Sequence, residues 1–234
     1  MEEDMDEHKF AEIPSESPLL NEAVKEQIAS VMAKLTQDVW LRAVVDCADR
    51  KCMELAAFLK AFARISPRLH LELYEPGEAP ALEEEMECRD LYPVTGLYLE
   101  KTKFSGISFR GIPGGQEINS FVIAFYNAAG PGQPLEEAVK DRIRAIQGKR
   151  SVQIFVSLAC HYCAETVILA QHIAACSPQI KAQMTDAGLY PALVEKYGLE
   201  RVPVILLNGE HRLTGGKSME ELLSFIEQDG IKNK

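Results

Sequence analysis

The sequence predicts an α/β protein made of two similar halves that form one continuous unit, each with the element order βαβαββα. Segments with a helical period alternate with short apolar runs typical of strands, and the same order occurs twice. Cys163 lies 111 residues after Cys52, and Pro203 lies 110 residues after Pro93. A Gly-Gly pair also precedes the last helix of each half. Together these recurrences indicate an internal duplication.

The first half is expected to cover residues 19–130 and to open on an amphipathic helix, "NEAVKEQIASVMAKL". Its apolar residues recur about every 3.6 positions, which indicates that one face packs on a core. The stretch "RLHLELYE" alternates apolar and polar residues, as a half-exposed strand does. The other elements expected in this half are a strand at 39–46, a helix at 51–65, two strands within 92–111 and a helix at 114–130.

The second half, residues 131–234, follows a break rich in Gly and Pro, "AAGPGQPLEE". Pro134 is placed to start the next helix, because proline suits the first helical turn. "VPVILLNGEHRL" is typical of two strands joined by an Asn-Gly turn. The other elements expected here are helices at 135–148, 164–175, 190–198 and 218–228 and strands at 151–158 and 179–186.

Residues 1–18 are expected to form an acidic, flexible leader, with seven Asp or Glu residues against one Lys. They contain no apolar segment of the kind that directs secretion. The net charge of −10 argues against a nucleic-acid surface and against binding to an anionic membrane. Six cysteines are too few for a disulfide scaffold in 234 residues. We therefore expect a cytoplasmic protein whose thiols are reduced at rest.

The stretch "SLACHYCAET" carries the chemistry that is easiest to recognise, because Cys160 and Cys163 are separated by two residues. An apolar strand ends at Leu158 and a helix is expected to begin near Cys160. A helix N-terminus favours a thiolate, and one helical turn brings the second thiol within disulfide reach. Cys160 should therefore be the exposed nucleophile and Cys163 the shielded resolving thiol. His161 could add a positive charge or a hydrogen-bond donor near the thiolate.

Two other interpretations of this cysteine pair stay open. It could be half of a zinc site, although zinc needs four ligands and the sequence contains no second pair with this spacing. It could also be two buried thiols without a redox role, because cysteine is among the residues most often buried.

Three motifs together resemble a known family: "SLACHYC", "VPVILLNG" and "FRGIPGGQEINSFVIAF". A strand, this cysteine motif, a helix and a later Val-Pro look like a thioredoxin or glutaredoxin fold. Residues 20–234 more closely resemble the N-terminal domain of the flavoprotein subunit of alkyl hydroperoxide reductase, which is two fused thioredoxin folds. Tandem protein disulfide oxidoreductases are more distant relatives. Tyr162 and Gln116 depart from that family, which typically has Asn and His there.

The resemblance implies a groove beside the cysteine pair. In this superfamily the bond before Pro203 is cis and its loop sits against the cysteines, so Val202, Pro203, His161 and Tyr162 would line the substrate groove. The resemblance also implies that Glu117 reaches from the first half toward the pair. A carboxyl group there could take the proton of the resolving thiol, provided that partial burial raises its pKa.

The first half is expected to be redox-silent. The resemblance implies that it has lost its pair, and Asp49-Arg-Lys-Cys52 stands where the second half has Cys160-His-Tyr-Cys163. Cys47 could still pair with Cys52, but four residues separate the two. This half would then bind a partner and hold the second half.

The resemblance implies a thiol-disulfide oxidoreductase that works through Cys160 and Cys163. Electrons would come from a separate flavoprotein disulfide reductase and pass to a peroxiredoxin or another protein disulfide. No Gly-rich dinucleotide motif opens a βαβ unit, so we expect that FAD and NAD(P)H bind only to a partner protein. A non-catalytic adaptor that binds a redox partner and a zinc-binding module are the alternatives.

Overall fold

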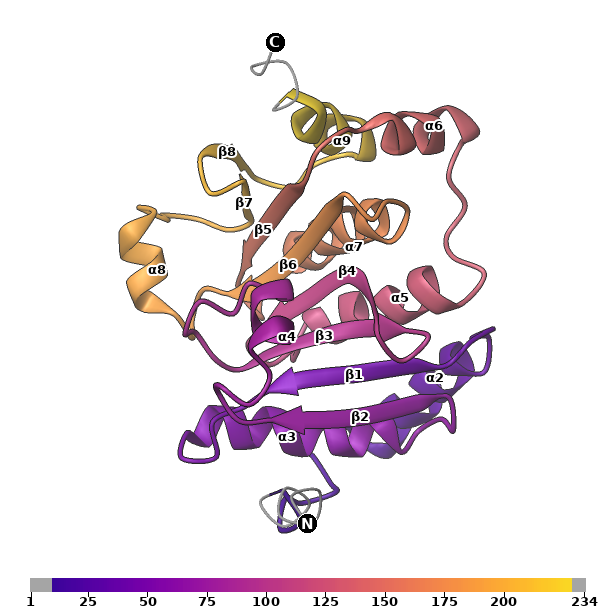
Figure 1. The fold of residues 1–234 in the computed structure, drawn as a ribbon, viewed down its shortest axis with the longest axis vertical. Coiled ribbons are helices and arrows are strands. Elements are labelled where there is room, and N and C mark those ends of the chain that lie inside the picture. Colours follow the sequence, from indigo (N-terminus) through magenta and orange to yellow (C-terminus); the bar gives the residue numbers. More distant parts are fainter. Residues whose placement is uncertain (1–9, 229–234) are drawn as a thin grey trace.

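The computed structural model describes residues 10–228 as a single mixed sheet of eight strands flanked by helices (Figure 1). The first half contains α2 (Glu22–Met32), β1 (Val39–Val44), α3 (Arg50–Ala63), β2 (Leu69–Tyr74), α4 (Pro80–Glu85), β3 (Val94–Leu99), β4 (Lys103–Arg110) and α5 (Glu117–Ala129). The second half contains α6 (Glu137–Ala145), β5 (Arg150–Val156), α7 (His161–Ala175), β6 (Ile180–Asp186), α8 (Pro191–Lys196), β7 (Val204–Leu207), β8 (His211–Thr214) and α9 (Met219–Gln228).

The strand order confirms the predicted repeat. It runs β2-β1-β3-β4-β6-β5-β7-β8, so each half has the same internal order. The halves join where β4 pairs in parallel with β6, with Ile107 opposite Ala182 and Arg110 opposite Thr185. Two copies of one unit thus share one uninterrupted sheet, which confirms the predicted α/β class and the prediction of one continuous unit.

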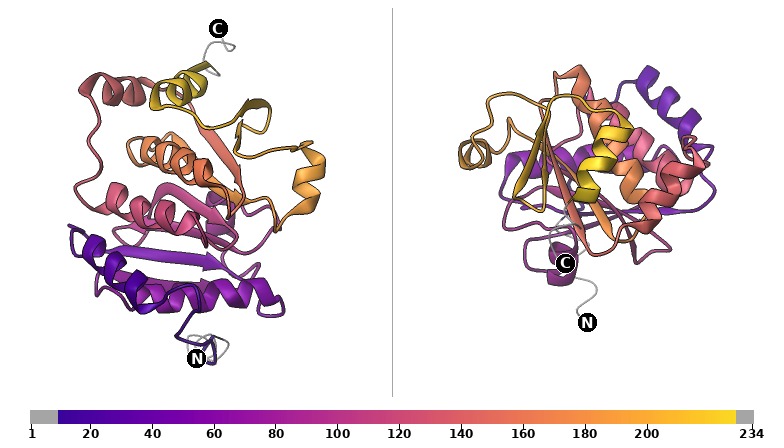
Figure 2. Two further views of the ribbon diagram at one scale, coloured as in Figure 1. Left: turned by 180° about the vertical axis from the view of Figure 1, so that it is seen from behind. Right: turned by 90° about the horizontal axis from the view of Figure 1, so that it is seen from above.

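Helices cover both faces of this sheet (Figures 1 and 2). Helices α3, α5 and α7 lie on one face, and the short α4 crosses the opposite face. Two of the three apolar clusters in the described part of the chain illustrate this division. On the α5 face, Phe62 and Phe125 pack around Phe121 with ring centroids 4.9 and 5.1 Å away. On the α4 face, Leu82 and Met86 belong to a smaller cluster.

The junction between the halves is polar as well as apolar. The Arg110 guanidinium is buried and donates to the Gln183 side chain at 3.1 Å and to the Glu87 carbonyl. Gln183 in turn donates to the carbonyl oxygen of Met86 at 2.8 Å. Because buried polar groups are costly without partners, this network fixes how the α4 region sits over β4 and β6.

Part of the flexible leader predicted at residues 1–18 packs against the rest of the protein. Residues 1–9 lie outside the described part of the chain, and nothing tests the prediction for them. Residues 10–18 correct it, because Ile13 and Ser17 are buried and Lys60 of α3 donates to the Ile13 carbonyl at 3.0 Å. Apolar Ile13 and Leu20 pack into the α5-face cluster. Among residues 10–228, none of the helices has both the length and the apolar character needed to span a bilayer.

Candidate redox site at the start of helix α7

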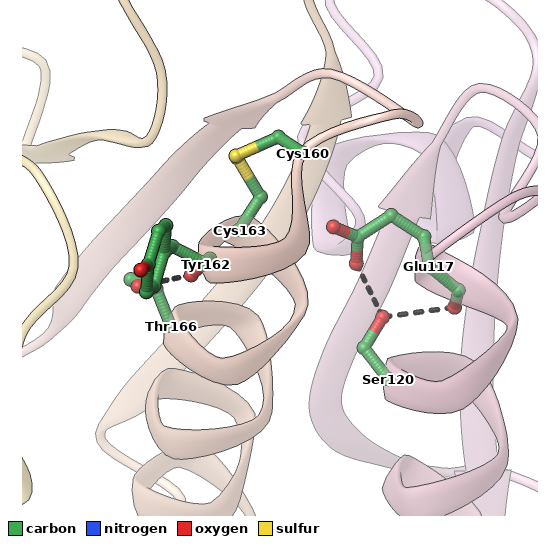
Figure 3. Close-up of a disulfide and its surroundings, with 6 residues drawn as sticks. All are labelled: Glu117, Ser120, Cys160, Tyr162, Cys163 and Thr166. Atoms are coloured by element: carbon green, nitrogen blue, oxygen red, sulfur yellow. Dashed lines mark hydrogen bonds between the residues drawn. A yellow bond between two sulfur atoms is a disulfide. The ribbon is translucent and has the colours of Figure 1, made fainter.

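Cys160 and Cys163 form a disulfide at the beginning of α7, with their Cα atoms 5.4 Å apart (Figure 3). Strand β5 is a mostly buried run that leads to this position, and Cys160 is the N-cap residue of the helix. Cys160 is half-buried, whereas Cys163 lies one turn inside the helix and is fully buried. This difference in exposure matches what we expected of an attacking and a resolving thiol.

The helix end itself favours a thiolate at Cys160. No side chain caps α7, and Cys160 occupies the position at which a helix presents unpaired N–H groups. Those N–H groups and the helix dipole stabilise negative charge at this point. The geometry is therefore suited to an attacking sulfur once the disulfide is reduced.

The two residues between the cysteines face solvent. The His161 ring lies edge-on to the Tyr162 ring, with centroids 6.0 Å apart, and its Nε2 is 3.9 Å from the Glu165 carboxylate. No hydrogen bond from His161 to either sulfur occurs among the described residues, so the predicted donor to the thiolate is not seen in this disulfide state. Tyr162 is 67% exposed.

The Val202–Pro203 peptide bond is cis, as the resemblance implied. Val204, the next residue, pairs with Phe155 of β5 in antiparallel register. Pro203 therefore lies at the same end of the sheet as the segment that leads into Cys160. Its carbonyl accepts a hydrogen bond of 2.9 Å from the Gly215 N–H, which ties the loop before α9 to this edge.

Glu117 begins α5 and is completely buried. In Figure 3 its carboxyl group points from α5 toward the side of α7 that carries the disulfide. The pKa of Glu117 is raised to about 7, chiefly by burial; the hydrogen bond from Ser120 opposes this shift, and the charge of nearby Asp186 contributes to it. Glu117 Oε1 has no hydrogen-bond partner among the described residues.

The Ser120 hydroxyl lies against two oxygen atoms of Glu117. It contacts both the Glu117 backbone carbonyl, at 2.9 Å, and Glu117 Oε2. A hydroxyl carries one hydrogen, so it can donate to only one of these oxygens. When the carboxyl group is ionised, donation from Ser120 to Oε2 stabilises the negative charge, and this hydrogen bond opposes the rise of the Glu117 pKa. The site can therefore hold the carboxyl group in either protonation state near neutral pH.

The first half also holds the loop before the cysteines. The Gln116 N–H donates to the Leu158 carbonyl at 2.9 Å. Gly115 has a φ of +55°, and a Cβ there would lie 2.3 Å from the same carbonyl oxygen. The Gly-Gly pair was visible in the sequence, but only as a mark of the repeat. Its contact with Leu158, and the nearness of Asp186 to Glu117, depend on the β4–β6 pairing, which leaves no local pattern in the sequence.

The equivalent site of the first half lacks a reactive pair. Asp49 is the N-cap residue of α3, as Cys160 is of α7, and its carboxylate accepts from the Cys52 N–H at 2.8 Å. Cys52 is a fully buried free thiol, and burial raises its pKa to about 12. Such a thiol is protonated at neutral pH, which supports the expectation of a redox-silent half.

A metal centre finds no support in the described part of the chain. Residues 10–228 contain no group of three or more His, Cys, Asp or Glu side chains that could hold a metal ion. The cysteine pair is joined in a disulfide, so it offers no thiolate ligands in this state.

Fold and site together define a tandem thioredoxin-fold oxidoreductase. Residues 150–227 match the family description of a thioredoxin domain. A solved structure of the alkylhydroperoxide reductase protein AhpF from Enterococcus faecalis (V583) is 36% identical and has a TM-score of 0.85. The match covers 89% of this chain and 99% of that one. The chain therefore belongs to the family of AhpF N-terminal domains of alkyl hydroperoxide reductase, which confirms the predicted resemblance.

Two further relatives are less similar in sequence to this chain. A protein disulfide oxidoreductase from Aeropyrum pernix shares the fold, with a TM-score of 0.78, 21% identity and coverage of 89% of this chain and 93% of its own. A curated NADH dehydrogenase from Bacillus subtilis (strain 168) is 26% identical over 206 residues, which is 88% of this chain and 38% of that protein. The chain thus spans well under half the length of the curated relatives it matches.

Proposed function

We propose that this chain relays electrons by thiol-disulfide exchange through Cys160 and Cys163. The donor would be a flavoprotein disulfide reductase that carries FAD and NAD(P)H, and the acceptor a disulfide in a peroxiredoxin or another protein. The observation that carries the proposal is the half-buried Cys160 at an uncapped helix N-terminus, one turn from a buried Cys163. The small number of cysteines supports a cytoplasmic location.

The exchange runs in two displacements that balance in sulfur and charge. In the reduced protein the Cys160 thiolate attacks one sulfur of the target disulfide. A mixed disulfide forms, and the other target sulfur leaves as a thiolate. Cys163 then loses its proton and attacks Cys160 Sγ, which re-forms the internal disulfide and releases the second target sulfur. Two electrons reach the target, and the flavoprotein restores the dithiol with two electrons and two protons.

Glu117 is the group best placed to take the proton of Cys163. It is buried, its carboxyl group points toward the disulfide, and its pKa of about 7 makes both protonation states accessible at neutral pH. Its unpartnered Oε1 leaves one oxygen free for this transfer. The cis bond before Pro203 would shape the groove, with Val202 at its rim and His161 and Tyr162 on the opposite side.

The test is reduction of insulin disulfides by dithiothreitol, with wild-type protein, Cys160→Ser and Cys52→Ala. We expect Cys160→Ser to lose all catalysis above the uncatalysed rate, because the attacking sulfur is gone. Cys52→Ala should keep it, because that thiol is buried at the silent site. Cys163→Ala should trap a mixed disulfide with insulin, visible on a non-reducing gel. Full activity in Cys160→Ser would rule out the relay and favour the adaptor.

A further inference from the structure

Tyr162 stands out on the surface of the described chain. It is 67% exposed and is the sole large hydrophobic side chain with such exposure among residues 10–228. It is also two positions from Cys160, the sulfur that the proposed relay uses for attack. Its backbone carbonyl accepts a hydrogen bond from the Thr166 side-chain hydroxyl at 3.1 Å. The ring itself is thus available at the surface, next to the cysteine pair.

The Tyr162 side chain leaves α7 close to the loop that precedes α9. A Cβ built on Gly216 would lie 3.7 Å from the Tyr162 Cβ, so the two backbones are close and Gly216 adds no side chain between them. Gly215, next to it, donates to the Pro203 carbonyl at 2.9 Å. The tyrosine thus flanks the same surface as the cis-proline loop, and a polypeptide docked there would cover the ring.

An exposed tyrosine beside a reactive sulfur favours large partners over small ones. Covering such a ring removes a large apolar area from water, and its hydroxyl can remain hydrated or find a partner. Tyrosine loses little conformational entropy on docking and is enriched among residues that dominate protein interfaces. A small disulfide reagent approaches the sulfur in line and covers little of the ring. Covering the ring therefore favours the binding of a disulfide that is carried on a polypeptide.

We infer that Tyr162 is an aromatic anchor that selects protein disulfides over low-molecular-weight disulfides. The inference rests on the proposed relay and specifies its substrate class. The ring packs on the polypeptide beside the target disulfide while Cys160 attacks it. Tyr162 acts on substrate selection and not on the sulfur chemistry. Its replacement should therefore change the rate constant for protein disulfides relative to that for low-molecular-weight disulfides.

The test measures single-turnover rate constants of the fully reduced protein with insulin and with bis(2-hydroxyethyl) disulfide. The readout is the rate constant for insulin divided by the rate constant for bis(2-hydroxyethyl) disulfide. Tyr162→Ala should lower the ratio at least tenfold, and Tyr162→Phe should keep it within about threefold of wild type. Glu165→Ala is the matched control, because Glu165 is exposed one turn further along α7, and should leave the ratio within twofold.

The possible outcomes distinguish a failure of the Tyr162 inference from a failure of the proposed electron relay. Wild-type protein that reacts with neither disulfide would contradict the relay itself. Wild-type protein that reduces both, together with a Tyr162→Ala ratio equal to that of wild type, would overturn the anchor alone. A Tyr162→Ala variant that loses both rates equally would also overturn it, because the ring would then act on the cysteines. Far-ultraviolet circular dichroism checks that each variant is folded.

Discussion

Glu117 shows how one side chain acquires its chemistry from the other residues around it. In water its carboxyl group would be ionised at neutral pH, but the fold buries it at the start of α5 beside the disulfide. Desolvation disfavours the charged form, and the Ser120 hydroxyl only partly compensates. Cys160 and Cys163 could be identified from their spacing alone. The partners of Glu117 could not, because Asp186 comes close only after the two halves have paired.

The raised pKa of Glu117 predicts how stability depends on pH. Its pKa rises from an ordinary 4.5 to about 7 on folding, so the folded state binds the proton more tightly than the unfolded state. Between these values stability falls as pH rises, by on the order of 3 kcal/mol in total. Glu117→Gln imitates the neutral carboxyl group and lacks this loss. We expect the oxidised variant to be more stable than wild type at pH 8.

Urea denaturation of the oxidised proteins at pH 4.5 and pH 8 measures this effect. The advantage of Glu117→Gln should be large at pH 8 and vanish at pH 4.5, where wild-type Glu117 is protonated in the folded protein. Glu26→Gln on the exposed side of α2 serves as the control and should show no such trend. An equal difference at both pH values would show that Glu117 does not titrate in this range.

Among the elements, the start of α5 and the segment before α7 form the contact that matters most for the site. Gly115 allows the two backbones to approach until the Gln116 N–H reaches the Leu158 carbonyl. Periodicity and turn residues placed both helices correctly, because those signals are local. They failed for residues 10–18, where a charged composition concealed apolar Ile13, and they could not show that α5 and α7 meet.

Gly115→Ala tests this approach, with Gly198→Ala as a matched control. Both glycines have a φ of +55°, but a Cβ on Gly198 has no heavy atom within 4 Å. The control should lose about 1 kcal/mol of stability, the cost of a left-handed alanine. Gly115→Ala should lose clearly more, because its Cβ would overlap the Leu158 carbonyl, and its insulin reductase rate should fall as well. Urea denaturation and the insulin assay measure both effects. Equal losses of stability in the two variants would show that the segment around Leu158 moves to accommodate the added Cβ without further cost.

At the scale of the whole molecule, the shared sheet and the buried Arg110–Gln183 contact make the halves interdependent. The repeat in the sequence predicted two copies of one unit. It did not show which strands would join them, because parallel β4–β6 pairing follows from the edge that each copy leaves open.

This interdependence predicts one unfolding transition. Trp40 is the single tryptophan and lies in β1, so its fluorescence reports on the first half, while far-ultraviolet circular dichroism reports on both. The two midpoints in urea should coincide. Arg110→Met should lower both midpoints together and reduce the free energy of unfolding by about 1 to 3 kcal/mol. The substitution leaves the Gln183 side-chain oxygen and the Glu87 carbonyl without their donor. Separate transitions would show that each half unfolds alone.

The β4–β6 junction is a head-to-tail contact, and contacts of that kind continue into open filaments unless their rotation closes a ring. Applied again, the same operation would add a third copy at the outer edge, where β8 stands in the position that β4 holds in the first copy. Strand β4 has eight residues and β8 has four. The outer strand therefore offers about half as many unpaired backbone groups to a newcomer, and shortened edges of this kind are a common protection against open-ended polymerisation.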